Sequence, residues 1–109
     1  MEVALKKNGF EVFKADNGMD GVAAAKKHLP DLVLMDVVMP GLNGFQATRQ
    51  LTQAKETAHI PVIIVTTKDQ QTDKLWGKRQ GAKGYLVKPV DEKKLVDSVR
   101  QVMEGAILF

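Results

Sequence analysis

The sequence contains no cysteine, so disulfide bonds and thiolate metal sites are excluded. Its apolar runs all fall short of the roughly 20 residues that a membrane-spanning helix needs. The opening stretch, MEVALKKNGF, is too short and too highly charged for a secretory signal. Aromatic residues make up only 6% and do not alternate with the basic ones, so nothing indicates nucleic-acid binding. We therefore expect a cytoplasmic protein with neither a membrane nor a nucleic acid as its partner.

The residues that are present are typical of one globular domain. The chain has 109 residues, of which 44% are hydrophobic and 27% charged, an ordinary balance for such a domain. The formal net charge is +3, and the excess comes from residues 55–109, which hold ten basic and seven acidic groups. These bases are dispersed among acids, which favours a solvated basic face. No linker divides the chain, so we expect a single domain over 1–109 with no output domain.

Helix-like and strand-like segments alternate along the sequence. The pattern predicts strands over 11–15, 32–35, 62–67 and 85–87, and helices over 3–7, 19–27, 44–54, 72–80 and 92–103. The second and third strands are continuous apolar runs, which is typical of strands covered on both faces. This alternation predicts an α/β fold, a doubly wound parallel sheet with helices on both faces. The last helix is expected to bury one face, formed by Leu95, Val99, Val102 and Met103.

Polar side chains follow three of these predicted strands. Ligands of such sheets bind at the carboxyl ends of the strands. The strand from Leu32 ends at Asp36, the next ends at Thr66 and Thr67, and the last ends at Lys88. Neighbouring parallel strands lie roughly 4.8 Å apart, so a carboxylate, two hydroxyls and an ammonium group can converge on one small ligand.

This set of groups is suited to phosphoryl transfer. A carboxylate can act as a nucleophile and form an acyl phosphate, while lysine and threonine can bind phosphoryl oxygens. The reaction depends mainly on positioning and charge neutralisation, usually with Mg²⁺. Each residue alone has an ordinary explanation: Asp36 as a turn or cap residue, Thr66 as a strand former, Lys88 as a solvated base. Their joint placement at three successive strand ends favours a shared site.

Three segments, LMDVVMPGLNG, PVIIVTT and GYLVKP, resemble the receiver domains of two-component response regulators. They occur in that family's order and at its spacing, and the resemblance runs to about Gly105. The stretch from Gly44 to Glu92 looks most like stand-alone receivers of the chemosensory systems that control type IV pili and twitching motility. The resemblance implies a flavodoxin-like fold with strand order 2-1-3-4-5, and a chemotaxis-like signalling protein that is not an enzyme.

The resemblance also implies a role for each residue of the site. Asp36 would be the phosphoacceptor, taking a phosphoryl group from a phosphohistidine of a histidine kinase. Lys88 would pair with a phosphoryl oxygen, and Thr66 and Thr67 would help to bind the phosphate. Thr66 would also be the switch hydroxyl, and Tyr85 the switch aromatic that turns inward when Thr66 moves. Taken alone, Tyr85 is better explained by core or rim packing.

The magnesium ion of such a domain would be held by the Asp36 carboxylate, by the backbone carbonyl of Val38 and by a pair of acids. Receivers carry that pair at the end of their first strand, and no such pair precedes Glu11. Asp16 and Asp20 belong to the following turn and helix. The chain is therefore expected to be a receiver whose first strand is missing, and to bind Mg²⁺ weakly.

In the family's order the missing strand is central, so its loss would leave a gap beside the 32–35 strand. Unpaired inner strand edges favour pairing with another segment. Three explanations compete: the strand lies outside the given sequence, a partner chain supplies it in a strand-sharing oligomer, or the apolar tail 106–109 fills the gap.

Three functions follow from these observations. The first is a receiver that binds a downstream protein when phosphorylated, through a surface formed by the 72–80 helix, the Tyr85 strand and the last helix. Its lysines suit an acidic partner: Lys74, Lys78, Lys83 and Lys94. The second is an interaction module that is not phosphorylated, because it lacks the acid pair. The third, a flavodoxin-like cofactor carrier, is disfavoured because no Ser/Thr/Gly phosphate-binding loop follows any predicted strand.

The first prediction concerns the missing acid pair. Mg²⁺ prefers octahedral oxygen coordination, and Asp36 with the Val38 carbonyl would supply too few ligands. We expect this chain to be phosphorylated slowly and to oligomerise. Adding an N-terminal strand that ends in two aspartates should speed labelling by acetyl phosphate and yield a monomer in sedimentation. Equal labelling rates, with both chains monomeric, would contradict this expectation.

Overall fold

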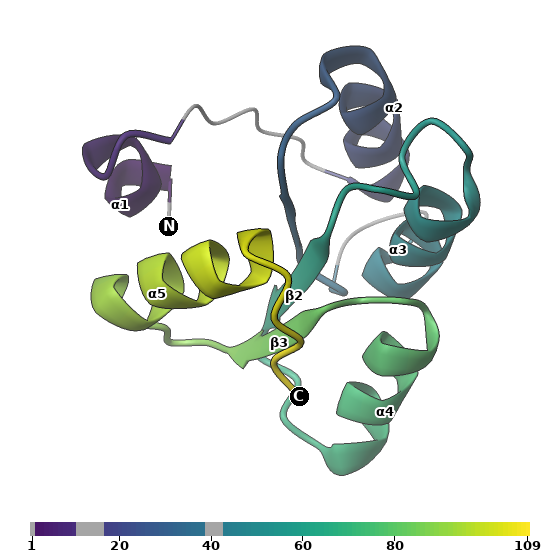
Figure 1. The fold of residues 1–109 in the computed structure, drawn as a ribbon. Helices are drawn as coiled ribbons and strands as arrows, with labels where there is room; N and C mark the ends of the chain where they lie inside the picture. Colours follow the sequence, from purple (N-terminus) through teal and green to yellow (C-terminus); the bar gives the residue numbers. More distant parts are fainter. Residues whose placement is uncertain (1, 11–16, 39–42) are drawn as a thin grey trace.

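Helices and strands alternate in the computed structural model, which describes residues 2–10, 17–38 and 43–109 (Figure 1). Along the chain, the elements are α1 (Glu2–Lys7), α2 (Gly18–His28), β1 (Val33–Met35), α3 (Gly44–Gln53), β2 (Val62–Thr66), α4 (Gln71–Arg79), β3 (Gly84–Val87) and α5 (Glu92–Met103). Every predicted helix is present, with ends that differ by at most a few residues. The predicted strand 11–15 lies outside the described residues.

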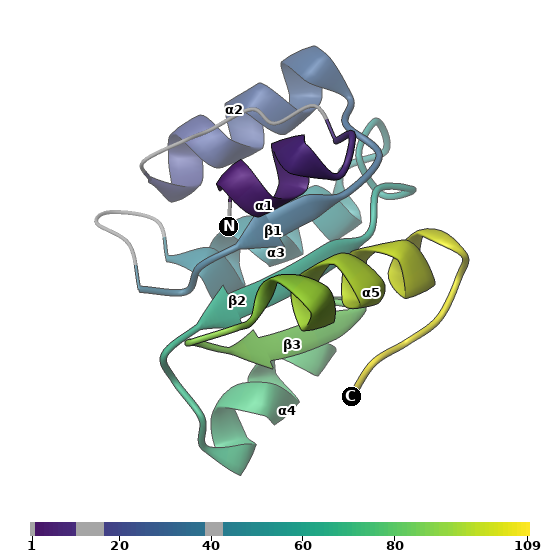
Figure 2. The same ribbon diagram turned by 90° about the vertical axis from the view of Figure 1, so that its left-hand side faces the viewer.

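The strands of the described part form one parallel sheet in the order β1-β2-β3. Met35 of β1 is in register with Ile64 of β2, and Ile64 is in register with Tyr85 of β3. The arrows in Figure 2 point the same way, so the three carboxyl ends lie at one edge of the sheet. This is the arrangement that the sequence predicted for the candidate site.

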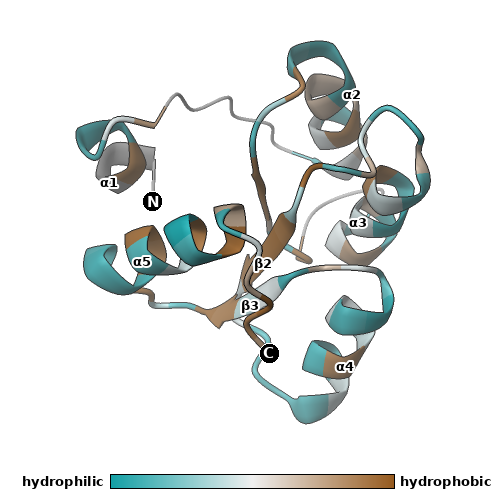
Figure 3. Cartoon of the chain, in the orientation of Figure 1, coloured by the Kyte–Doolittle hydropathy of each residue, from teal (hydrophilic) through white to brown (hydrophobic). Residues whose placement is uncertain are grey.

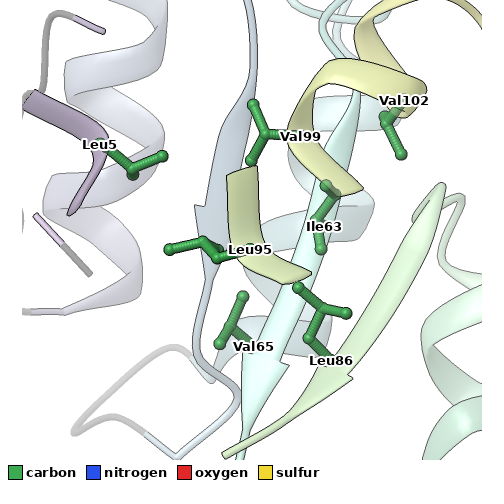
Figure 4. Packing of buried hydrophobic residues seen from close by; sticks show 7 residues of the cluster. All are labelled: Leu5, Ile63, Val65, Leu86, Leu95, Val99 and Val102. Carbon is green, nitrogen blue, oxygen red and sulfur yellow. The ribbon is translucent and has the colours of Figure 1, made fainter. Parts of the chain in front are cut away.

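The core lies on both faces of the sheet, because alternate side chains of a strand point to opposite faces. On one face, Ile63 and Val65 of β2 belong to one cluster with residues of α5 and with Leu5 of α1 (Figure 4). On the other face, Val62 packs with α2 and α3, and Ile64 packs with Tyr85. Figure 3 shows the strands as apolar and much of the helical surface as hydrophilic. The sheet is thus covered on both faces, as the alternation of segments predicted.

The two apolar strands differ in burial. All residues of β2 are buried, as predicted, whereas Val33 and Leu34 of β1 are only half-buried. The 32–35 strand is covered on both faces as predicted, since Leu34 packs against the cluster of α5 and Val33 against that of α2 and α3, but it is not fully buried. The reason is its position: within residues 2–10, 17–38 and 43–109, β1 pairs with β2 alone and lies at an edge of the sheet.

Side-chain caps fix the starts of three helices. The carboxamide oxygen of Asn17 accepts a hydrogen bond from the Asp20 backbone N–H (2.8 Å) at the start of α2. Asn43 forms a capping box with Gln46 at the start of α3, and Asp91 caps α5. The expected buried face of α5 is confirmed for its leucine and valines, but Met103 is 43% exposed and Val96 is buried.

The C-terminal tail does not fill the gap beside β1. Leu108 instead forms a parallel bridge with Gly84 of β3, and its N–H donates to the Lys83 carbonyl at 2.7 Å. Because β1 and β3 lie at opposite edges of the described sheet, this position rules out the tail as the substitute for a strand next to β1. Leu108 takes the outer position because its side chain packs against the α5 face of the core.

In the part of the chain that the structure describes, every helix is too short or too polar to cross a lipid bilayer.

Candidate functional site

Asp36 follows β1 directly, and both oxygens of its carboxylate accept hydrogen bonds. Oδ1 accepts from the backbone N–H of Val38 (3.0 Å), and Oδ2 accepts from the Lys88 ammonium group (2.8 Å). The side chains of Asp36 and Lys88 are 30% and 37% exposed. The ion pair is therefore shielded by protein on one side and reachable from solvent on the other.

Lys88 is placed by the end of β3. Its backbone N–H donates to the Thr66 carbonyl at 2.8 Å, which extends the pairing of β2 and β3 beyond the last residue of β3. The Lys88 side chain crosses the end of β2, and its ammonium group reaches the Asp36 carboxylate. The structure thus brings together Asp36 and Lys88, as the strand ends predicted.

The environment of Asp36 keeps its carboxyl group ionised. Partial burial raises the pKa, but hydrogen bonds from Lys88, the Val38 N–H and the Thr66 hydroxyl, together with the positive charge of Lys88, outweigh it. The net effect lowers the pKa of Asp36 below its ordinary value of 3.8. At neutral pH the group is a carboxylate, which is the form that can act as a nucleophile.

The two threonines at the end of β2 differ in position. Thr66 is fully buried and its hydroxyl accepts a hydrogen bond from the Lys68 N–H (3.4 Å). Thr67 is exposed and lines a shallow hollow together with Lys88, Pro89 and Val90. Thr66 therefore belongs to the immediate surroundings of Asp36, whereas Thr67 lies at the rim.

Tyr85 points inward. The residue is only 9% exposed, and its hydroxyl donates to the Lys68 carbonyl at 2.8 Å. Burial, followed by the negative charges of Asp73, Asp36 and Asp69, raises the pKa of Tyr85 to about 12. The ring lies inward in this structure, and the predicted coupling of its position to a movement of Thr66 stays a prediction.

Lys68 has a role that the sequence did not predict. Its N–H donates to the Thr66 hydroxyl, and its carbonyl accepts from the Tyr85 hydroxyl. The backbone N–H and carbonyl of Lys68 thus connect Thr66 and Tyr85, the two predicted switch residues. The sequence offers no signal for this link, because the contacts are made by backbone atoms, which every residue type carries.

Gly44 is a second residue whose role was missed. It begins α3, and its N–H points back to the Val37 carbonyl (3.5 Å). A Cβ atom on Gly44 would clash with the carbonyl oxygen of Asp36 and would lie 2.6 Å from the Val37 Cα. The absence of a side chain lets α3 pack directly on the backbone that carries Asp36.

The described residues do not by themselves form a magnesium site. They contain no group of three or more His, Cys, Asp or Glu side chains placed to hold a metal. Both carboxylate oxygens of Asp36 already accept hydrogen bonds, and Mg²⁺ requires about six oxygen ligands. The binding of Mg²⁺ by Asp36 and by the Val38 carbonyl stays a prediction. Asp20 is hydrogen-bonded to Asn17 at the start of α2, and Asp16 lies outside the described residues.

The fold and the three strand ends define a class of signalling domain. The chain belongs to the response regulator receiver domain family, whose model matches residues 1–100. It is 66% identical over 101 residues to the protein PilH of Pseudomonas aeruginosa, covering 93% of this chain and 84% of PilH. It is also 38% identical to the response regulator PleD of Caulobacter vibrioides, covering 94% of this chain but only 22% of PleD.

Solved structures give the same answer for the fold. The receiver domain of NarL from Mycobacterium tuberculosis superposes with a TM-score of 0.88 at 29% identity, covering 95% of this chain and 84% of that one. The receiver domain of a Pseudomonas aeruginosa sensor histidine kinase, solved with magnesium in its active-site cleft, has a TM-score of 0.87 at 27% identity, covering 95% and 85%. The flavodoxin-like α/β fold and the receiver resemblance are confirmed.

The second prediction concerns Gly44. Because a methyl group at this position meets backbone rather than a flexible side chain, Gly44→Ala should destabilise the domain by about 1–3 kcal/mol or more, as overpacking does. Urea unfolding provides the measurement. Gly84→Ala is the matched control, since its Cβ would lie at an ordinary 3.5 Å from the Ile63 side chain. Equal midpoints for the two variants would show that α3 does not need a glycine here.

Proposed function

We propose that this chain is the phosphoacceptor of a two-component phosphorelay, which takes a phosphoryl group from a histidine kinase onto Asp36. The observation that carries this proposal is the ionised Asp36 carboxylate 2.8 Å from the Lys88 ammonium group, with Thr66 beside it, at the ends of three parallel strands. Membership of the receiver family supports it. We extend the proposal to residues 1–109 as one receiver domain.

The transfer step uses the chain's own groups as follows. A carboxylate oxygen of Asp36 attacks the phosphorus of the phosphohistidine, forming an O–P bond while the P–N bond breaks. The imidazole leaves with the electron pair of that bond. Lys88 exchanges its hydrogen bond to Oδ2 for one to a phosphoryl oxygen, and its charge balances the negative charge that the phosphoryl group brings. The Thr66 hydroxyl is placed to donate to a second phosphoryl oxygen.

The signal would leave the site through Lys68. A Thr66 hydroxyl that moves onto the phosphoryl group pulls on the Lys68 N–H, and the Lys68 carbonyl in turn holds the Tyr85 hydroxyl. Since Tyr85 packs under α4, a change at Asp36 would reach the α4 surface through a chain of direct contacts. Phosphorylation can shift this arrangement only by the difference in its free energy of interaction with the two states.

The proposed output surface comprises α4, β3 and α5. Trp76 is 53% exposed, and the Arg79 guanidinium lies 5.8 Å from its ring centroid. Three lysines on this surface are also exposed: Lys78, Lys83 and Lys94. An exposed aromatic ring among cations suits an acidic protein partner. The likeness to PilH supports placing this partner in a type IV pilus chemosensory system.

The alternative is an interaction module that is not phosphorylated. It is favoured by one observation: in the described part of the chain, no cluster of acids accompanies Asp36 to hold a metal ion. The two functions differ in whether Asp36 accepts a phosphoryl group at all, which labelling decides.

The third prediction tests phosphorylation itself. Acetyl phosphate should add one phosphoryl group, and peptide mapping should locate it on Asp36. Asp36→Ala should abolish labelling, and Lys88→Ala should slow it by at least about tenfold, because a donor to the transferred group is lost. Lys93→Ala, which removes an exposed lysine on α5, serves as the control. Label on another residue, or none in the wild type, would favour the alternative.

The fourth prediction concerns the Thr66 switch. The chain has one tryptophan, Trp76 on α4, so its fluorescence reports the output surface. Acetyl phosphate should change this emission in the wild type. Thr66→Ala should lose most of the change per labelled molecule, because Lys68 no longer responds to the phosphoryl group. Thr67→Ala is the matched control. A full emission change in labelled Thr66→Ala would refute the assignment of Thr66 as the switch.

A further inference from the structure

Gly77 is the point at which α4 rests on the sheet. Among Gln71–Arg79 it is the buried residue of the helix, and it faces the ring of Tyr85. A Cβ atom on Gly77 would lie 2.8 Å from Cδ1 of Ile64 and 3.2 Å from Cδ2 of Tyr85. Both distances are shorter than ordinary carbon contacts, so the space next to Gly77 is already filled by these two side chains.

The ring of Tyr85 has little freedom to adjust inside. It packs with Ile64, Val37 and Ala82 in one buried cluster, and its hydroxyl is held by the Lys68 carbonyl. Ile64 is fully buried, so its terminal methyl group cannot turn out to solvent. Interiors packed to this density transmit even a one-methyl change to their neighbours.

The helix itself is also held in place. The hydroxyl of Thr52 in α3 donates to the Gln80 carbonyl at the end of α4 (2.7 Å), and the Ala82 N–H donates to the Gly77 carbonyl (3.1 Å). A methyl group added at position 77 would therefore crowd the packed side chains of β2 and β3, and α4 cannot easily move away to make room for it. Of the two crowded side chains, Tyr85 is the more exposed (9% against 0% for Ile64), so we expect its ring to be the one displaced.

We propose that Gly77 is a positioning residue for the switch: because it has no side chain, the ring of Tyr85 has room to lie inward against α4. In this arrangement the inward ring is set by the α4 contact as well as by Thr66, and α4 and Tyr85 can move only together. The inference rests on the proposed function for its role in signalling, but the position of the ring can be tested separately.

The test uses the only tyrosine of the chain, so the ultraviolet absorbance of the phenolate reports Tyr85 alone. The wild type should ionise with a pKa of about 12, and Gly77→Ala should lower this toward the ordinary 10.0 as the ring becomes exposed. We expect a shift of about one pH unit, a tenfold change in the ionisation constant. Gly84→Ala, whose added methyl group meets no crowded contact, should titrate as the wild type does.

A double variant separates crowding from other effects. Ile64→Val removes the Cδ1 atom nearest to position 77, so Ile64→Val/Gly77→Ala should titrate between Gly77→Ala and the wild type. Wild-type titration by folded Gly77→Ala, with circular dichroism confirming the fold, would overturn the proposal. If Gly77→Ala does not fold, the double variant is compared with Ile64→Val: a lower pKa in the double variant supports the proposal, and an equal one overturns it.

The signalling role has its own measurement. Per molecule labelled by acetyl phosphate, the change in Trp76 emission should fall in Gly77→Ala and stay at the wild-type level in Gly84→Ala. An unchanged emission response in Gly77→Ala would overturn the role of Gly77 in the switch. Absence of labelling in the wild type would refute the proposed function, while the titration would still decide whether Gly77 positions the ring.

Discussion

The ion pair between Asp36 and Lys88 is the interaction on which the site depends. A carboxylate that is partly buried loses hydration, which would raise its pKa and favour the protonated form. The ammonium group at 2.8 Å reverses this effect and keeps the group charged. Because Asp36 follows β1 and Lys88 follows β3, the pair also joins the two outer strands of the described sheet across the end of β2. An incoming phosphoryl group would compete with Asp36 for Lys88, so the resting ion pair and the proposed reaction use the same cation.

The contacts behind this pair form two layers. Thr66 lies beside Asp36, and the backbone of Lys68 connects Thr66 to Tyr85. Tyr85 in turn fills the space that Gly77 leaves under α4. Each residue in this series contacts the next through a hydrogen bond or a close packing contact. A displacement of Thr66 is therefore expected to displace Tyr85 as well. This continuity gives a physical reason why a change of charge at Asp36 could alter the surface of α4.

The features of the fold that depend on residues close together in the sequence could be predicted from the sequence. The helix ranges were predicted to within a few residues because the periodicity of apolar residues is a local signal, and the strand ends placed Asp36 and Lys88 together because parallel strands share one edge. Gly44 and Gly77 were not readable as site residues, since the contacts that exclude a side chain come from distant parts of the chain. The partial exposure of Val33 and Leu34 depends on which segment lies beside β1, and the composition of an apolar strand does not identify the segment that pairs with it.

The two edges of the described sheet explain why the apolar tail lies beside β3 and not in the gap beside β1, which was one of three explanations that the sequence left open. An apolar segment can lie beside any strand whose edge is open, and its composition does not distinguish β1 from β3. The length of the connection does distinguish the two strands. The tail follows α5, which packs over Ile63, Val65 and Leu86. Gly105, with its positive φ of 101°, then turns the chain back toward β3. Leu108 can then reach Gly84 within a few residues, whereas the outer edge of β1 lies across the whole sheet. The position of the tail is therefore decided by where α5 ends, and the edge of β1 is left to be covered by some other segment.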